Sequence, residues 1–251
     1  MPDSLRIAAV SYTNTFPFVY GIEHSALLKD YHLALLPPAQ CASVFESGKA
    51  DIALVPSGAL PGLKDYNIIS PYCIGAHNEV KTVLLLSHKK IEDIKSVGLD
   101  TESGTSVLLV KVLAKNFWGI KPAWEHVNIP EDYKQAGTDA LVVIGDKAVE
   151  LSSHFSYQAD FAAEWKRFTK LPFVFAVWIC RNHVSEKEIS LFNSALQYGL
   201  EHIPQVIKKY KNQGAPRLDK EAYFRENIDF HFDEVKKTSL QKFLTFIADL
   251  D

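Results

Sequence analysis

The segment VGLDTESGTSVLLVKVL, residues 97–113, decides the fold of this chain. Its apolar beginning predicts a short strand over 97–99, and the apolar run after Gly104 predicts a helix over 106–117. A strand that passes through a polar, glycine-containing turn directly into a helix is the building unit of α/β proteins. The same alternation is therefore expected on both sides of this segment.

The alternation of strands and helices continues in both directions. Upstream, runs rich in Val, Ile and Ala predict strands over 5–10, 33–36 and 51–55, helices over 18–28 and 39–46, and two extended stretches over 68–75 and 80–87. Pro38 and Gly48 flank the helix over 39–46 in the order that helices favour. Downstream, the predicted elements are strands over 123–125, 140–144 and 171–180, followed by helices over 186–211, 220–227 and 239–250.

This layout predicts an α/β fold of two lobes in which the second lobe interrupts the first. Residues 1–86 and 178–251 form the first lobe and residues 87–177 the second, with a cleft between them. The extended crossings at 83–87 and 173–180 would serve as hinge strands, and two crossings allow the lobes to close on a ligand without unfolding. The alternative is a single continuous sheet.

Composition and charge argue against several classes of protein. The net charge of −3 over 251 residues gives no general attraction to nucleic acid or to an anionic membrane. No apolar run approaches the ~18 residues of a membrane-spanning helix, and the N-terminus MPDSLRIAAVSYTN lacks the pattern of a signal peptide. The three cysteines are far apart and form neither a disulfide framework nor a metal-binding spacing. We expect a cytoplasmic protein with no nucleic-acid or membrane partner.

The turn that precedes the helix over 106–117 is the most informative candidate site. It places the hydroxyls of Thr101, Ser103, Thr105 and Ser106 around Gly104. Unpaired backbone N–H groups and the positive end of a helix dipole bind anions without Lys or Arg. The alternative is simple N-capping, but capping needs one hydroxyl and four are present. Because the spacing lacks the glycine pair and the Gly-Lys-Ser/Thr ending of a phosphate loop, we favour a carboxylate as the ligand.

Two further loops follow predicted strands and are expected at the same edge of the sheet, where α/β proteins bind ligands. The first, SYTNTFP (11–17), contains Asn14, whose amide either faces the cleft or satisfies the loop backbone. The second contains Ser57, which either faces the same cleft or caps the next helix. The sequence has neither a Gly-x-Ser-x-Gly nucleophile turn nor a His-Glu-x-x-His metal motif, and we expect no cofactor and no metal.

These segments, in this order, resemble the chorismate dehydratase family of the futalosine route to menaquinone. The matching stretches are VSYTNTFPFVYG (10–21), SGKADIALVPSG (47–58), KTVLLLS (81–87), LDTESGTSVLLVKVL (99–113), VVIGDKA (142–148) and EWKRFTKLPFVFAVW (164–178). The region after Arg181 resembles the family only loosely. Three positions depart from the family pattern: Thr13 stands where Leu is usual, Thr82 where Ser is usual, and Gly104 where Arg is frequent.

The resemblance implies a type II periplasmic-binding-protein-like fold and the conversion of chorismate, a small dicarboxylate, to 3-[(1-carboxyvinyl)oxy]benzoate and water without a cofactor. It implies catalytic roles for Asn14 and Thr82, with Asn14 at the departing hydroxyl. It also implies a set of substrate-binding residues: Ser11, Tyr12, Ser57, Ser103, Thr105, Ser106, Gly145 and Asp146. The proton acceptor stays open between the substrate's enolpyruvyl carboxylate, a water molecule and a polar side chain.

A different class of function fits the same fold. A solute-binding protein of a transporter, or a ligand-sensing domain, would bind a small carboxylate without changing it. We favour the enzyme because the N-terminus shows neither a signal peptide nor a lipoprotein cysteine, and because no basic helix-turn-helix segment of a sensor is evident.

Overall fold

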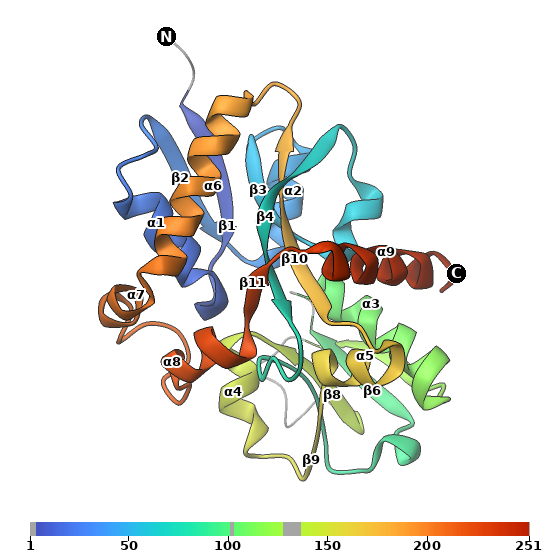
Figure 1. The fold of residues 1–251 in the computed structure, drawn as a ribbon. Helices are drawn as coiled ribbons and strands as arrows, with labels where there is room; N and C mark the ends of the chain where they lie inside the picture. Colours follow the sequence, from blue (N-terminus) through green and yellow to red (C-terminus); the bar gives the residue numbers. More distant parts are fainter. Residues whose placement is uncertain (1–3, 101–102, 128–136, 251) are drawn as a thin grey trace.

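The computed structural model describes residues 4–100, 103–127 and 137–250, whose strands form two mixed sheets (Figure 1). The first sheet contains β1 (Leu5–Val10), β2 (Tyr31–Leu36), β3 (Ile52–Pro56), β4 (Tyr66–Ala76), β10 (Phe173–Arg181) and β11 (Asp229–His231). Its strand order is β11-β4-β10-β3-β1-β2. β1 runs parallel to β2 and β3, and the other neighbouring pairs are antiparallel.

The second sheet contains β5 (Val83–Ser87), β6 (Ser96–Asp100), β7 (Ala123–Val127), β8 (Ala140–Ile144) and β9 (Tyr157–Asp160). Its order is β7-β6-β8-β5-β9, with β6 parallel to both neighbours and β5 antiparallel to both of its own. Within the described residues no strand of one sheet pairs with a strand of the other. The predicted two-lobed α/β fold is confirmed, and the alternative of a single continuous sheet is wrong.

The chain passes from the first sheet to the second between Ala76 and Val83, and it returns between Asp160 and Phe173. The two crossings lie side by side because Phe173 of β10 pairs with Ala76 of β4. Residues 83–86 pair within the second sheet, and residues 173–177 pair within the first. Each change of sheet therefore comes earlier in the chain than the predicted lobe boundaries after residues 86 and 177. The run over 80–87 reads as one extended stretch in the sequence, but Lys81 has a φ of +62° and turns the chain before β5 begins.

Helices cover the sheets and join their strands. Those of the first sheet are η1 (Thr13–Thr15), α1 (Phe16–His24), α2 (Pro38–Glu46), η2 (Ser57–Gly62), α6 (Glu186–Glu201) and α7 (Ile203–Lys209). Those of the second are η3 (Ile91–Asp93), α3 (Gly104–Leu113), η4 (Ala114–Trp118), α4 (Asp146–Ser152) and α5 (Phe161–Thr169). The chain ends with α8 (Lys220–Ala222), η5 (Tyr223–Asn227) and α9 (Glu234–Ala248).

Several boundaries differ from the sequence-based prediction. The single helix predicted over 186–211 is two helices, because the backbone leaves the helical region at His202 and Pro204 lies in the first turn of α7. The last helix begins at 234 rather than 239, since the Asp233 side chain caps it by accepting from the backbone N–H of Lys236. α4, β9 and α5 have no counterpart in the prediction, and Asp160 caps α5.

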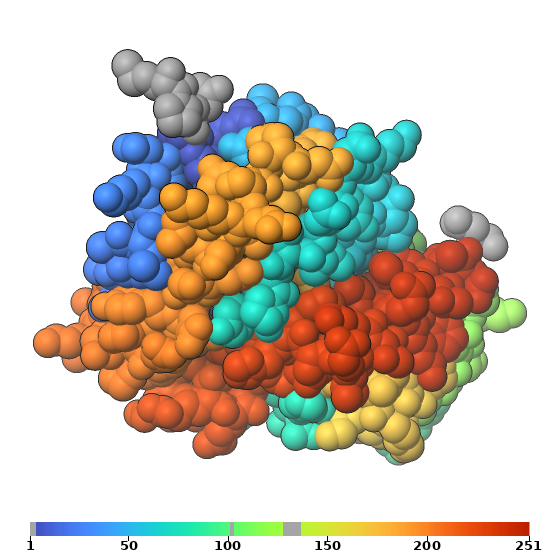
Figure 2. Space-filling model, turned by 45° about the horizontal axis from the view of Figure 1, so that its top comes forward, coloured from blue at the N-terminus to red at the C-terminus, as the bar shows by residue number. Residues whose placement is uncertain are grey.

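The C-terminal residues lie across the junction of the two lobes, where Figure 2 shows them as a red band. In the core beneath α9, Trp165 of α5 packs edge-on against Phe173 and Phe243. Its indole N–H donates to Ser239 Oγ at 2.9 Å, and that hydroxyl donates to the backbone oxygen of Pro172. α9 therefore holds α5 against the crossing by which the chain returns to the first sheet.

α1 and α6 pack with their backbones in close contact at two glycines. A Cβ on Gly199 would lie 1.8 Å from the backbone oxygen of Pro17, and a Cβ on Gly21 would lie 2.0 Å from that of Ala195. Neither neighbour is a flexible side-chain end, so an added methyl group must push the helices apart.

We therefore expect Gly199→Ala to lower the free energy of unfolding by about 1–3 kcal/mol, the usual effect of overpacking. Urea denaturation measures the change. Gly62→Ala is the matched control, because no atom lies within 4 Å of its added Cβ. The control should keep or slightly raise the stability, since alanine restricts the unfolded chain. Equal midpoints for Gly199→Ala and the wild type would contradict the close helix contact.

Candidate functional site

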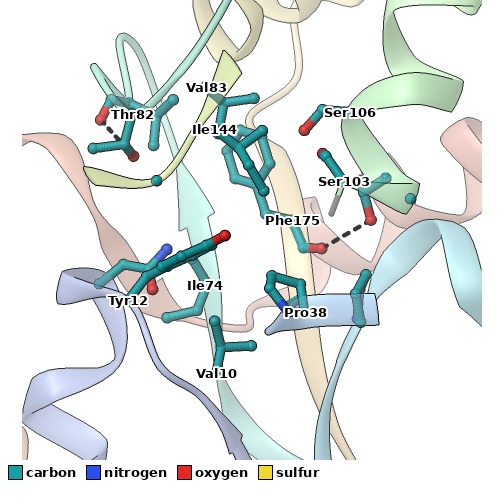
Figure 3. Close-up of a pocket in the computed structure, with 17 residues that line it drawn as sticks. Val10, Tyr12, Pro38, Ile74, Thr82, Val83, Ser103, Ser106, Ile144 and Phe175 are labelled. Carbon is teal, nitrogen blue, oxygen red and sulfur yellow. Dashed lines mark hydrogen bonds between the residues drawn. The ribbon is translucent and has the colours of Figure 1, made fainter. Parts of the chain in front are cut away.

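A cleft lies between the two sheets, where residues of both lobes and of the crossing after β4 meet (Figure 3). The loops after β1 and β8 open into it, as do the end of β3, the beginnings of α2 and α3, and the middle of β10. Its lining residues are Val10, Tyr12, Asn14, Pro38, Pro56, Ile74, Val80, Thr82, Val83, Ser103, Gly104, Thr105, Ser106, Ile144, Gly145, Phe175 and Ala176.

The lining combines apolar walls with a few neutral polar groups. The apolar part includes Val10, Ile74, Ile144 and Phe175, and such apolar walls are usual in sites for small molecules. Among the described residues that line the cleft there is no Asp, Glu, Lys, Arg or His. An anion bound here would be stabilised by hydroxyl, amide and backbone N–H donors and by the dipole of α3.

The beginning of α3 supplies two hydroxyls that are not used elsewhere in the described structure. Ser103 is the N-cap residue, but its side chain makes no capping hydrogen bond. Neither its hydroxyl nor that of Ser106 has a hydrogen-bond partner among the described residues, although both side chains are almost fully buried. Figure 3 shows both at the end of α3 that faces the cavity. This arrangement favours the anion-site interpretation over simple capping by Ser103. Thr101, predicted in the same turn, lies outside the described residues.

Thr105 and Ser57 bond to the backbone instead of pointing a free hydroxyl into the cleft. Thr105 Oγ1 accepts from the N–H of Gly58 at 3.0 Å and donates to the oxygen of Phe175 at 3.3 Å. It thereby joins α3 of the second lobe to η2 and β10 of the first. Ser57 is fully buried, donates to the oxygen of Val174 at 2.7 Å, and does not line the cleft.

The loop after β1 contributes Tyr12 and Asn14 to the lining, and Figure 3 shows Tyr12 across the cavity from Ser103 and Ser106. Asn14 Oδ1 accepts from the hydroxyl of Thr15 at 3.0 Å, whereas the amide N–H groups of Asn14 have no acceptor among the described residues. The amide is thus available to a ligand as a donor. Ser11 is exposed and lies outside the lining, and its backbone N–H extends the pairing of β1 with β2 by donating to Leu36.

Gly145 and Asp146 form the turn between β8 and α4. Gly145 has φ +65° and ψ −148°, a conformation that essentially only glycine adopts, and an added Cβ would lie 3.0 Å from the ring of Tyr12. Tyr12 therefore packs directly on the backbone of the opposite lobe. Asp146 does not line the cleft. Burial raises the pKa of its carboxyl, although nearby hydrogen-bond donors of Thr13 and Ala215 favour the charged form.

Thr82 lines the cleft at the end of the first crossing, and its partner is a residue that sequence analysis missed. Thr82 Oγ1 lies 2.8 Å from the phenol oxygen of Tyr223, and both side chains are about 1% exposed. Tyr223 belongs to the C-terminal segment, 141 residues away in sequence. No motif surrounds it, so only the packing of η5 against the crossing reveals the contact.

Two classes of site are not found in the described part of the chain. Residues 4–100, 103–127 and 137–250 contain no group of three or more His, Cys, Asp or Glu side chains arranged to hold a metal ion. None of the helices in these ranges combines the length and the apolar character that crossing a membrane requires.

Comparison with known proteins relates the chain to one family. The model of a family described as "Menaquinone biosynthesis" matches residues 5–249. A chorismate dehydratase of Thermus thermophilus is 26% identical over 253 residues, with 92% of this chain and 91% of that protein covered.

Solved structures resemble the chain at low sequence identity and therefore show the fold alone. Protein AF1704 from Archaeoglobus fulgidus has a TM-score of 0.76 at 15% identity, covering 98% of this chain and 97% of that one. A Candida albicans protein with the generic periplasmic binding protein fold has a TM-score of 0.71 at 14% identity, with 99% and 91% covered. The aliphatic sulphonate binding protein SsuA of Escherichia coli has a TM-score of 0.67 at 16% identity, with 99% and 93% covered. The predicted periplasmic-binding-protein-like fold is confirmed.

The different hydrogen bonding of two neighbouring hydroxyls predicts different effects on stability. Thr105→Val removes the partner of two backbone groups, so we expect the free energy of unfolding to fall by about 1–3 kcal/mol. Ser106→Ala removes a buried hydroxyl that has no described partner, so no hydrogen bond is lost and the free energy of unfolding should not fall. Thermal and urea unfolding measure both. Equal losses in the two variants would show that the hydroxyl of Thr105 does not hold the lobes together.

Proposed function

The chain belongs to the menaquinone biosynthesis family, and on that premise we propose that it is a chorismate dehydratase. The reaction removes water from chorismate and leaves 3-[(1-carboxyvinyl)oxy]benzoate. The observation that carries the proposal is the neutral cleft, in which the hydroxyls of Ser103 and Ser106 are available on one side and the amide of Asn14 on the other. The name of the Thermus thermophilus relative supports the same activity.

The chemistry of the reaction needs few protein groups. The proton to be removed is on the ring carbon that bears the enolpyruvyl ether, in vinylogous relation to the ring carboxylate. When this C–H bond breaks, its electron pair enters the ring π-system. The C–O bond of the neighbouring hydroxyl breaks, and that oxygen takes a proton and leaves as water. The product ring is aromatic, so the enzyme has mainly to orient the substrate, stabilise charge on the carboxylate and donate to the departing oxygen.

The cleft offers a group for each of these tasks. In our proposal Ser103, Ser106 and the first backbone N–H groups of α3 bind one carboxylate, and the apolar wall of Ile74, Ile144 and Phe175 packs on the ring.

Asn14 donates to the departing hydroxyl, and Thr82 assists from the crossing. Thr105, Ser57 and Gly145 act by holding the lobes and the turn in place.

The proton acceptor in this proposal is the substrate's own enolpyruvyl carboxylate or a water molecule. Among the described residues of the lining there is no carboxylate and no imidazole. Asp146 is half-buried beside Thr13 and Ala215 and does not line the cavity.

We expect the purified protein, with no metal or nucleotide added, to convert chorismate to a product lighter by one water molecule. Mass spectrometry after incubation measures the product, and NMR identifies the aromatic ring. A chorismate signal that stays unchanged at high enzyme concentration would contradict the proposal. If the protein binds chorismate without converting it, the solute-binding or sensing alternative is favoured instead.

We expect Asn14→Ala to lower turnover by about 10²-fold, the typical effect of removing one donor that stabilises developing charge. Product affinity should change little, because the hydrogen bond matters most in the transition state. Asn14→Asp should lose both turnover and affinity, since its charge repels a dicarboxylate. Single-turnover rates and equilibrium product binding measure these effects. Asn182→Ala, an exposed position beyond the far end of β10, is the matched control. Normal turnover in Asn14→Ala would end the catalytic assignment.

A further inference from the structure

We propose that Tyr223 is a positioning residue for Thr82. Its phenol donates a hydrogen bond to Thr82 Oγ1 and thereby directs the proton of the threonine hydroxyl into the cleft, where it serves the substrate. This inference rests on the proposed function and extends it to the C-terminal segment, which the family model also covers.

Among the described residues, the phenol of Tyr223 has one hydrogen-bond partner, Thr82, and Thr82 connects it to the cleft. The phenol oxygen lies 2.8 Å from Thr82 Oγ1, and Thr82 lines the cleft whereas Tyr223 does not. Tyr223 is the first residue of η5 and is almost completely buried. A buried contact of this kind, made by a residue of the lining, restricts the orientation of the threonine hydroxyl.

The backbone that carries Thr82 is fixed from three sides. The N–H of Lys81 donates to Asp160 Oδ2 at 2.7 Å, which holds the left-handed turn at Lys81. The oxygen of Thr82 accepts from the N–H of Gly145 at 2.7 Å. Asn227 Nδ2, one turn after Tyr223, donates to the backbone oxygen of Glu79 at 3.1 Å. Since the backbone is held and a β-branched side chain has few rotamers, the direction of the O–H bond is the main freedom that Thr82 retains.

The surroundings of the two oxygens decide which one donates. Thr82 Oγ1 has a second possible acceptor in the oxygen of Val80, at 3.4 Å (Figure 3). The phenol oxygen of Tyr223 has no second partner among the described residues. If Thr82 donated to Tyr223, the buried phenol proton would have no acceptor, which is unfavourable. Tyr223 therefore donates, and Thr82 keeps its own proton for another acceptor.

That acceptor is the ligand in the cleft. The 3.4 Å distance to Val80 is longer than the usual range for a hydroxyl hydrogen bond, so this contact is weak and easily exchanged. A hydroxyl that accepts one hydrogen bond becomes a stronger donor in the next. In the proposed reaction Thr82 thus donates more strongly to the substrate oxygen on which charge develops.

The protonation state of the phenol agrees with this role. Burial raises the pKa of Tyr223. The contact with Thr82 opposes this rise in part, and the nearby carboxylates of Asp146 and Asp160 add to it. The raised pKa keeps the phenol of Tyr223 protonated at neutral pH, so it is able to donate.

The test is a double-mutant cycle on chorismate turnover with Tyr223→Phe, Thr82→Val and the two combined. We expect Tyr223→Phe to lower kcat by about tenfold, with a smaller change in KM, because one hydrogen bond to the working hydroxyl is lost. In the Thr82→Val background the same change should have no further effect on kcat. In the Thr82→Ser background, where the hydroxyl is retained, Tyr223→Phe should again lower kcat.

Tyr210→Phe is the matched control. Tyr210 is also buried, and its phenol donates to Glu23 Oε2 at 3.3 Å, away from the cleft. This variant should keep the wild-type kcat, and thermal unfolding verifies that all variants fold. A kcat of Tyr223→Phe within twofold of the wild type, or an equal loss in the Thr82→Val background, would overturn the positioning role alone. A wild-type protein that does not convert chorismate would overturn the proposed function itself.

Discussion

Strands β4 and β10 pair antiparallel from Phe173 with Ala76 to Arg181 with Tyr66, and this ladder brings both crossings between the sheets to one place. All parts of the cleft depend on it. The outgoing crossing presents Thr82, and β10 itself presents Phe175 and the oxygen that Thr105 binds. Because two neighbouring strands carry the connection, the lobes can change their angle only by a hinge motion, which preserves the order of groups along each wall.

The anion site that we propose in the cleft is built from neutral groups. A buried Lys or Arg would need its own partner when the ligand is absent, whereas hydroxyls and backbone N–H groups carry a smaller desolvation cost. Ser103 and Ser106 stand at the beginning of α3, where the helix dipole adds a partial positive charge. Because the lining is neutral, no protein carboxylate among its described residues would repel the negative charge that develops on the substrate in the transition state. This arrangement favours a reaction in which the substrate itself carries the charge.

The C-terminal segment contributes to the site although it forms none of its walls. At the outgoing crossing, Tyr223 forms a hydrogen bond with Thr82, and Asn227 donates to the backbone oxygen of Glu79. At the returning crossing, Ser239 of α9 bonds to Trp165 and to the backbone oxygen of Pro172. Both crossings are therefore held in place by contacts with η5 and α9, which lie far from them in the sequence. The close contact of α1 with α6 at Gly21 and Gly199 anchors the beginning of that segment.

The sequence by itself determined the α/β class and the two-lobed order, because apolar periodicity, turn glycines and prolines act over a few residues. It also indicated some of the loops that reach the cleft, such as those with Asn14 and Ser103. It did not show the break at His202, the strand β9 or the contact of Tyr223. Ser103 and Ser106 could not be distinguished from Ser57 and Thr105, since all four are hydroxyl residues in polar turns. Only the tertiary structure decided which are available, because Ser57 bonds to Val174, 117 residues away, and Thr105 to Phe175, 70 residues away. Hydrogen-bond partners at such separations are set by the packing of the two sheets, and no local pattern encodes them.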